Sequence, residues 1–116
     1  RRSAAKKYCE QLKEVKEIKL PAEMPYAKHV YHLFVIQTDK RDELQKFLNE
    51  NEIATGLHYP VPLHLQKCFE HLGYKKGDFP VTENLAANCL SLPMFPELSE
   101  EQIGFICYKI KLFFNY

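Results

Sequence analysis

The sequence lacks the short motifs that mark a self-contained catalytic centre. Only four of its 116 residues are glycine. They form no glycine-rich phosphate loop, and neither an HExxH metal motif nor a GxSxG nucleophile motif occurs. We therefore expect no catalytic residue, as distinct from a binding residue, in this chain.

Neither an excess of one charge nor a long hydrophobic run is present. Sixteen Lys and Arg residues face fifteen Asp and Glu residues, which leaves a net charge of +1. Such a balance offers no electrostatic footprint for nucleic acid or an anionic membrane. The most apolar stretch, residues 103–114, is interrupted by Lys109 and Lys111, and no signal peptide is recognisable. We expect a soluble, cytoplasmic protein.

Paired cysteines are also missing. The four cysteines form no CxxC motif, and each lies among apolar residues: Cys9, Cys68, Cys89 and Cys107. This pattern predicts buried free thiols in a reducing compartment.

The spacing of apolar residues predicts five helices. The first opens the chain, the second begins with Asp39 as its N-cap and stops near Asn51, and a short third ends at Gly73. The fourth lies around Leu85. The last follows Ser99, which begins a capping box, and ends the chain.

Between these helices, residues rich in Val, Ile, Phe and Tyr predict strands. They lie at residues 29–38 and 53–58, with a brief one at 90–92. Residues 1–116 are long enough for one domain with a modest core. The expected class is α/β in the broad sense, a two-layer α+β arrangement with a small mixed or antiparallel sheet covered by helices.

The start of the chain is unusual. Arg1 and Arg2 already lie inside the first predicted helix, with neither a capping residue nor an initiating Met before them. We expect this chain to be a fragment of a longer protein.

The segment most suggestive of function is residues 56–66, GLHYPVPLHLQ. His58, Tyr59 and His64 lie there on a turn stiffened by Pro60 and Pro62, which presents side chains at low entropic cost. Imidazole and phenol groups hydrogen-bond phosphate and hydroxyl oxygens. The residue types predict a site for an anionic, hydroxyl-rich ligand.

Two other interpretations are open at this stage. In the plainer one, His58 points to solvent, Tyr59 packs in the core and the prolines only shape a turn. In the other, His64, Cys68 and His71 lie at steps of four and three along one side of a helix and bind zinc. Such a row does not converge tetrahedrally without further ligands, so packing of Cys68 in the core is the preferred reading.

A longer series of segments resembles a known family. The matching segments are residues 53–66 (IATGLHYPVPLHLQ), 72–74 (LGY), 78–83 (DFPVTE) and 90–96 (LSLPMFP), supported by Arg1, Arg2 and Tyr8 and by residues 32–36 (HLFVI). Together they resemble the C-terminal domain of the DegT/DnrJ/EryC1/StrS sugar-nucleotide aminotransferases. The resemblance spans nearly the whole chain.

The resemblance implies a pyridoxal 5'-phosphate (PLP) enzyme that acts as a homodimer. A preceding large domain would hold the cofactor with a Schiff-base lysine and an aspartate, neither of which is recognisable here. Glutamate would supply an amino group to the keto group of a deoxysugar linked to dTDP or UDP, for surface polysaccharide or amino-sugar biosynthesis. Alone, this chain would be inactive. The alternative is a free-standing small α/β binding or interaction module, which could bind zinc.

The resemblance also implies roles for individual residues. His58 and Tyr59 would bind the phosphates or sugar of the substrate, reaching the neighbouring active site across the dimer, and His64 would line the same pocket or brace the loop. One departure concerns Glu52, where the family often has glycine. We expect Asn51 to take the left-handed turn that this requires.

Overall fold

The computed structural model describes residues 1–116. The elements follow one another along the chain as α1 (Arg2–Leu12), β1 (Phe34–Gln37), α2 (Arg41–Glu50), η1 (Leu63–Leu65), η2 (Lys67–Leu72), α3 (Pro80–Asn88), β2 (Cys89–Leu92) and α4 (Glu100–Phe113). The two η elements are 3₁₀ helices. None of the helices has both the length and the apolarity needed to cross a lipid bilayer.

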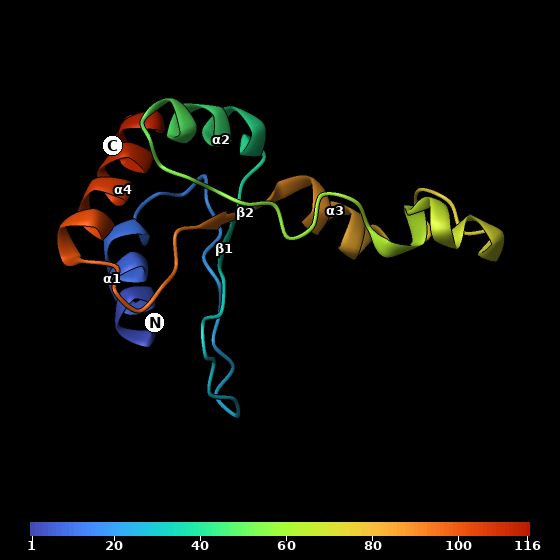
Figure 1. Cartoon of the computed structure of the whole chain (residues 1–116), viewed down its shortest axis with the longest axis horizontal. Helices are drawn as coiled ribbons and strands as arrows, with labels where there is room; N and C mark the ends of the chain where they lie inside the picture. Colours follow the sequence, from blue (N-terminus) through green and yellow to red (C-terminus); the bar gives the residue numbers. More distant parts are fainter.

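The body of the molecule is a small sheet covered on one face by helices α1, α2 and α4 (Figure 1). Strands β1 and β2 pair antiparallel, with Phe34 opposite Leu92 and Val35 opposite Ser91. Single bridges widen the sheet on both sides, from Lys19 to Gln37 and from Gly56 to Ser91. The predicted class, a small antiparallel sheet covered by helices, is confirmed.

The burial of successive side chains alternates along β1, as expected for a sheet with helices on only one face. Phe34 and Ile36 are fully buried, whereas Val35 and Gln37 lie half-buried on the opposite face. The Phe34 ring stacks on Tyr8 of α1, with ring centroids 4.8 Å apart. The core therefore lies between the sheet and the three helices, and the other face of the sheet is left for a site.

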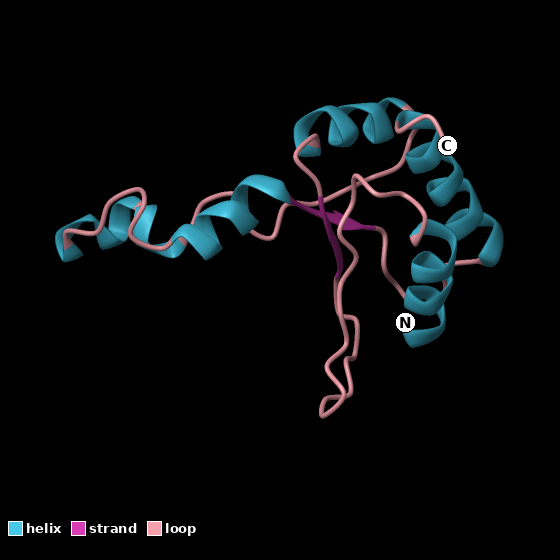
Figure 2. Cartoon of the chain, turned by 180° about the vertical axis from the view of Figure 1, so that it is seen from behind, coloured by secondary structure: helices cyan, strands magenta, loops and turns pink.

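Two segments extend away from this body (Figures 1 and 2). One is the loop of residues 21–33, which Arg2 holds through an ion pair with Glu23 and a hydrogen bond to the His29 carbonyl. The other, which we call the arm, comprises residues 60–88 and contains η1, η2 and α3. The two extensions explain the elongated shape, with extents of 48 × 35 × 25 Å.

The strand prediction for residues 29–38 was too long. Only Phe34–Gln37 is extended and paired. Tyr31 has a φ of 48°, a left-handed conformation that ends any strand, and its amide donates to His29 Nδ1. Residues 53–58 form no strand either, apart from the single bridge at Gly56.

Two predictions about the ends of α2 were wrong. Lys40, not Asp39, occupies the N-cap position, and no side chain caps this helix. At the other end Glu52, not Asn51, adopts the left-handed conformation, with a φ of 60°. Asn51 instead donates from its side-chain amide to the Phe47 carbonyl, which keeps it within the helical turn.

The prediction for the cysteines was wrong at Cys68 and incomplete at Cys9. All four thiols are free, and Cys89 and Cys107 are buried. Cys68 is exposed because η2 lies far out on the arm, where no core exists to cover it. Cys9, within α1, is half-buried.

The capping box at the start of α4 is confirmed, and it leads to a prediction about stability. Ser99 Oγ accepts from the Gln102 amide at 3.1 Å, and Gln102 Oε1 accepts from the Ser99 amide at 2.9 Å. We expect Ser99→Ala to lower the free energy of unfolding by about 1 kcal/mol. Urea denaturation followed by circular dichroism measures the change. Ser3→Ala, at an exposed position within α1, is the control and should have little effect.

Candidate functional site

The two residues predicted to bind ligand lie side by side and outside the core. His58 is exposed, and the side chain of Tyr59 is 73% exposed. Their rings meet edge to face with centroids 5.5 Å apart, and the peptide bond between them is cis. The structure does not place Tyr59 in the core, as the plainer interpretation of the sequence required.

His58 is held by the strand beside it. The Gly56 amide donates to the Ser91 carbonyl at 3.0 Å and the Ser91 amide donates to the Gly56 carbonyl at 2.8 Å, which fixes the backbone two residues before His58. The His58 Nδ1 atom lies 2.9 Å from Ser91 Oγ. This imidazole therefore has a defined orientation although it faces solvent.

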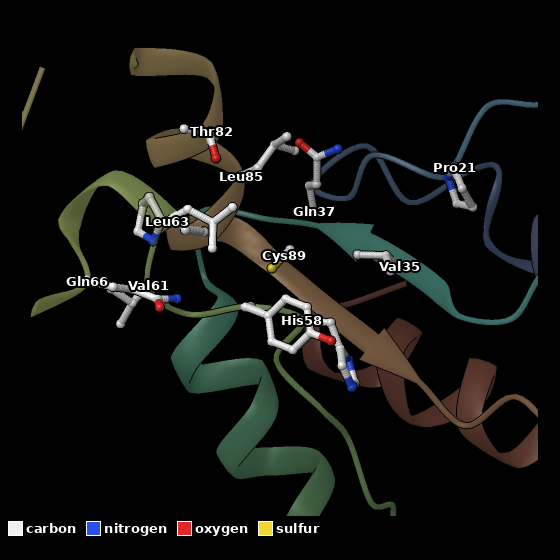
Figure 3. Close-up of a pocket in the computed structure, with 13 residues that line it drawn as sticks. Pro21, Val35, Gln37, His58, Val61, Leu63, Gln66, Thr82, Leu85 and Cys89 are labelled. Carbon is white, nitrogen blue, oxygen red and sulfur yellow. The ribbon is translucent and has the colours of Figure 1, made fainter. Parts of the chain in front are cut away.

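His58 and Tyr59 border a cavity of about 480 Å³ between the uncovered face of the sheet and the arm (Figure 3). The polar side chains that line it besides these two are Gln37, Gln66 and Thr82. Apolar walls come from β1, from the loop before η1 and from α3. Amides, a hydroxyl, a phenol and an imidazole can hydrogen-bond a ligand rich in hydroxyl and carbonyl oxygens.

His64 lies elsewhere, inside the arm. Its side chain is only 7% exposed, and it is not among the residues that line the cavity. Its Nε2 atom lies 2.9 Å from Glu83 Oε1, and its ring packs against Phe79 with centroids 4.8 Å apart. Of the two roles considered for His64, the geometry favours bracing the arm.

Glu83 is the centre of that brace. Its carboxylate accepts hydrogen bonds from the Gly77 amide at 2.9 and 3.0 Å and from the Phe79 amide at 3.3 Å, in addition to the contact with His64. Burial raises the pKa of this carboxyl. The hydrogen bonds from Gly77, His64 and Phe79 outweigh that effect and hold the pKa below its ordinary value. One carboxylate thus joins η1, the loop before α3 and α3 itself.

The alternative zinc site does not assemble. His64 faces Glu83, the thiol of Cys68 points toward the Gln66 side chain 3.8 Å away, and His71 is exposed. The structure contains no group of three His, Cys, Asp or Glu side chains arranged to hold a metal ion. The step of four and three residues predicted one face of a single helix. His64 instead lies in η1 and Cys68 and His71 lie in η2, and Gln66 between these two 3₁₀ helices is extended.

Sequence reasoning missed two residues of this region, Ser91 and Glu83, as functional candidates. The sequence does distinguish Ser91, because it is the one residue with a hydroxyl group in the otherwise apolar run from Cys89 to Leu92. Its partner, His58, lies 33 residues away, and no local pattern links the two. Glu83 lies in a segment that carried the family resemblance, but nothing local identified its partners.

Comparison with known proteins places the chain in a family. The model of the DegT/DnrJ/EryC1/StrS aminotransferase family matches residues 1–111. The chain belongs to this family. Its members and structural neighbours are PLP-dependent sugar aminotransferases, so the resemblance recognised in the sequence is confirmed.

Two curated relatives match most of this chain. The chain is 51% identical over 96 residues to the "Pleiotropic regulatory protein" of Geobacillus stearothermophilus, covering 83% of this chain and 26% of that protein. It is 43% identical over 111 residues to the UDP-N-acetyl-3-dehydro-alpha-D-glucosamine 3-aminotransferase of Acidithiobacillus ferrooxidans. This match covers 96% of this chain and 29% of that protein.

The solved structure of S. venezuelae DesV in complex with a ketimine intermediate superimposes with a TM-score of 0.95 at 32% identity. The superposition covers 99% of this chain and 31% of DesV. The chain therefore spans between about a quarter and a third of the length of the proteins that it matches.

Proposed function

We propose that this chain is the C-terminal domain of a PLP-dependent aminotransferase that transfers an amino group from glutamate to the keto group of a dTDP- or UDP-linked deoxysugar. The product would be an amino sugar for surface polysaccharide or a related glycan. The observation that carries the proposal is the display of His58 and Tyr59, outside the domain's own core, at the border of a cavity lined by hydrogen-bonding groups. Relatives that act on UDP- and dTDP-linked sugars supply the substrate class.

An extensive uncovered apolar surface supports a larger parent protein. The exposed large apolar side chains on the arm are Val61, Leu63, Leu65, Phe69, Leu72, Tyr74, Phe79, Val81 and Leu85. Surfaces of this kind are normally buried against another segment or subunit. We propose that the preceding domain and the second subunit of a homodimer cover them, which brings His58 and Tyr59 to an active site formed largely outside this chain.

The residues that line this cavity do not fit the cofactor. No lysine and no carboxylate lines the cavity, so neither a Schiff base to PLP nor an acidic partner for its pyridine nitrogen can come from there. When bound, PLP supplies the electron sink for amino transfer. We assign its binding to segments outside this chain, and we expect the chain alone to be inactive.

His58 and Tyr59 would then serve binding and orientation. A phenol and an imidazole hydrogen-bond the phosphates or the sugar, which lowers the cost of placing the keto carbon for reaction. His64 would act through the arm, as the brace that holds the loop carrying both residues. We propose a cytoplasmic location for the enzyme, which the free thiols and the use of nucleotide sugars support.

The proposal is tested in the full-length enzyme by following 2-oxoglutarate released from glutamate with a dTDP- or UDP-linked keto-sugar. We expect Tyr59→Phe and His58→Ala each to raise KM for the sugar nucleotide about tenfold, the effect of one lost hydrogen bond, with kcat changed less. KM for glutamate should not change. Tyr26→Phe, which alters an 87% exposed phenol on the loop of residues 21–33, is the matched control.

Two results would count against this proposal. An unchanged KM for the sugar nucleotide in both variants would remove His58 and Tyr59 from the substrate site. Release of 2-oxoglutarate by the chain without any further segment would show that the cofactor site is not outside it.

A further inference from the structure

Ser91 has one side-chain partner, and that partner is His58. Ser91 is 5% exposed and lies in the middle of β2. Its Oγ atom is 2.9 Å from His58 Nδ1 and makes no other hydrogen bond in the structure. A buried hydroxyl without a partner is destabilising, so this contact accounts for a polar residue inside an apolar strand.

The direction of this hydrogen bond follows from the partners available. A serine hydroxyl is a donor that needs an acceptor, and His58 Nδ1 is the acceptor within reach. If Nδ1 carried the proton, the buried Ser91 hydroxyl hydrogen would have no acceptor. The neutral imidazole therefore accepts at Nδ1 and carries its proton on Nε2, which hydrogen-bonds no group of this chain.

Gly56 also constrains the position of this ring. A Cβ atom at residue 56 would lie 2.7 Å from His58 Cε1 and 3.3 Å from Nδ1. Real Cβ atoms do not approach a ring so closely, so the imidazole can occupy this place only because residue 56 has no side chain. The backbone of Gly56 is in turn fixed to Ser91 by two hydrogen bonds.

We propose that Ser91 and Gly56 are positioning residues that fix the imidazole of His58 with its Nε2–H directed at an anionic oxygen of the nucleoside diphosphate. This inference rests on the proposed function, because it requires His58 to contact the ligand. It goes further in naming the tautomer, the donor atom and the two residues that set them. A neutral donor fixed in this way binds a phosphate oxygen without itself having to be protonated.

The test measures binding of UDP and of dTDP to the full-length enzyme by isothermal titration calorimetry. We expect Ser91→Ala and Gly56→Ala each to weaken binding of the preferred nucleotide about tenfold, and Ser91→Thr, which keeps the hydroxyl, to retain most of the affinity. Thr38→Val is the matched control, since it removes another buried hydroxyl at the end of β1, where Thr38 accepts from the Lys40 amide. Its affinity should equal that of the wild type.

A second set of variants separates positioning from a general structural role. In a His58→Ala background, Ser91→Ala and Gly56→Ala should have no further effect on affinity, because the ring that they position is gone. A loss of the same size with and without the imidazole would overturn the inference. If Ser91→Ala does not fold, which a thermal melt will show, Gly56→Ala provides the same comparison with and without the imidazole.

The two proposals fail in different ways. If His58→Ala leaves binding of UDP and dTDP unchanged, then His58 does not contact the ligand and the proposed function loses its site. If His58→Ala weakens binding while Ser91→Ala and Gly56→Ala do not, then His58 binds ligand but these two residues do not position it.

Discussion

Replacing Phe34 with alanine should lower the free energy of unfolding by about 3–5 kcal/mol, the usual cost of deleting a fully buried aromatic ring. Phe34 is 0% exposed and stacks on Tyr8, and its ring also lies 6.3 Å from that of Tyr31. It joins the sheet to α1 and to the base of the loop of residues 21–33. No neighbour can fill the space without moving one of these elements, so the cavity will remain.

The neighbouring residue provides the matched control. Val35 is in the same strand but lies half-buried on the opposite face, where it lines the cavity beside the arm. Val35→Ala should therefore cost clearly less, on the order of 1 kcal/mol. Urea denaturation followed by circular dichroism compares the two variants. Equal losses at Phe34 and Val35 would mean that the core is not confined to the helix-covered face.

The helical body could be predicted from the sequence because its signals are local. Apolar residues at helical spacing identified α1, α2 and α4, and the capping box located the start of α4 within one residue. Strand lengths could not be predicted in the same way. Residues 29–33 have strand-like composition, but the backbone at Tyr31 turns left-handed while Arg2 and Glu23, distant in sequence, hold the loop.

In the candidate site, too, local features were predictable from the sequence and long-range contacts were not. The stiff turn bearing His58 and Tyr59 was visible as a short run of residue types, and the structure brings both to one cavity. The shape of that cavity was not predictable, because it depends on the base of the arm and α3 lying beside the uncovered face of β1. The contacts of His58 with Ser91 and of His64 with Glu83 join residues 33 and 19 positions apart, beyond any local pattern.

Replacing Glu83 should make the arm more mobile, because this carboxylate joins η1, the loop before α3 and α3. We expect Glu83→Ala to increase amide hydrogen exchange at Gly77 and Phe79 about tenfold or more, because both amides lose the carboxylate that they donate to. Exchange in α1 and α4 should not change, since neither helix touches this carboxylate. The control is Asn84→Ala, on the next residue of α3, whose amide oxygen accepts only from the Asn88 side chain.

The pH dependence of the arm follows from the same carboxylate. Its pKa in the folded arm lies below the ordinary glutamate value of 4.5, so folding favours the charged form. The stabilisation is therefore complete above pH 4.5 and is lost as the pH falls through the lower, folded-state value. His64 is the titratable side chain that faces it.

This sign leads to a specific comparison between variants. Glu83→Gln keeps the size of the side chain and can still accept through its amide oxygen, but it cannot titrate. Amide exchange rates at Gly77 and Phe79 are compared above and below pH 4.5 after correction for the intrinsic exchange rate. In Glu83→Gln the corrected rate should be the same on both sides of this pH. In the wild type it should increase only below pH 4.5. Acceleration of the same size in both proteins would assign the acid sensitivity of the arm to another group.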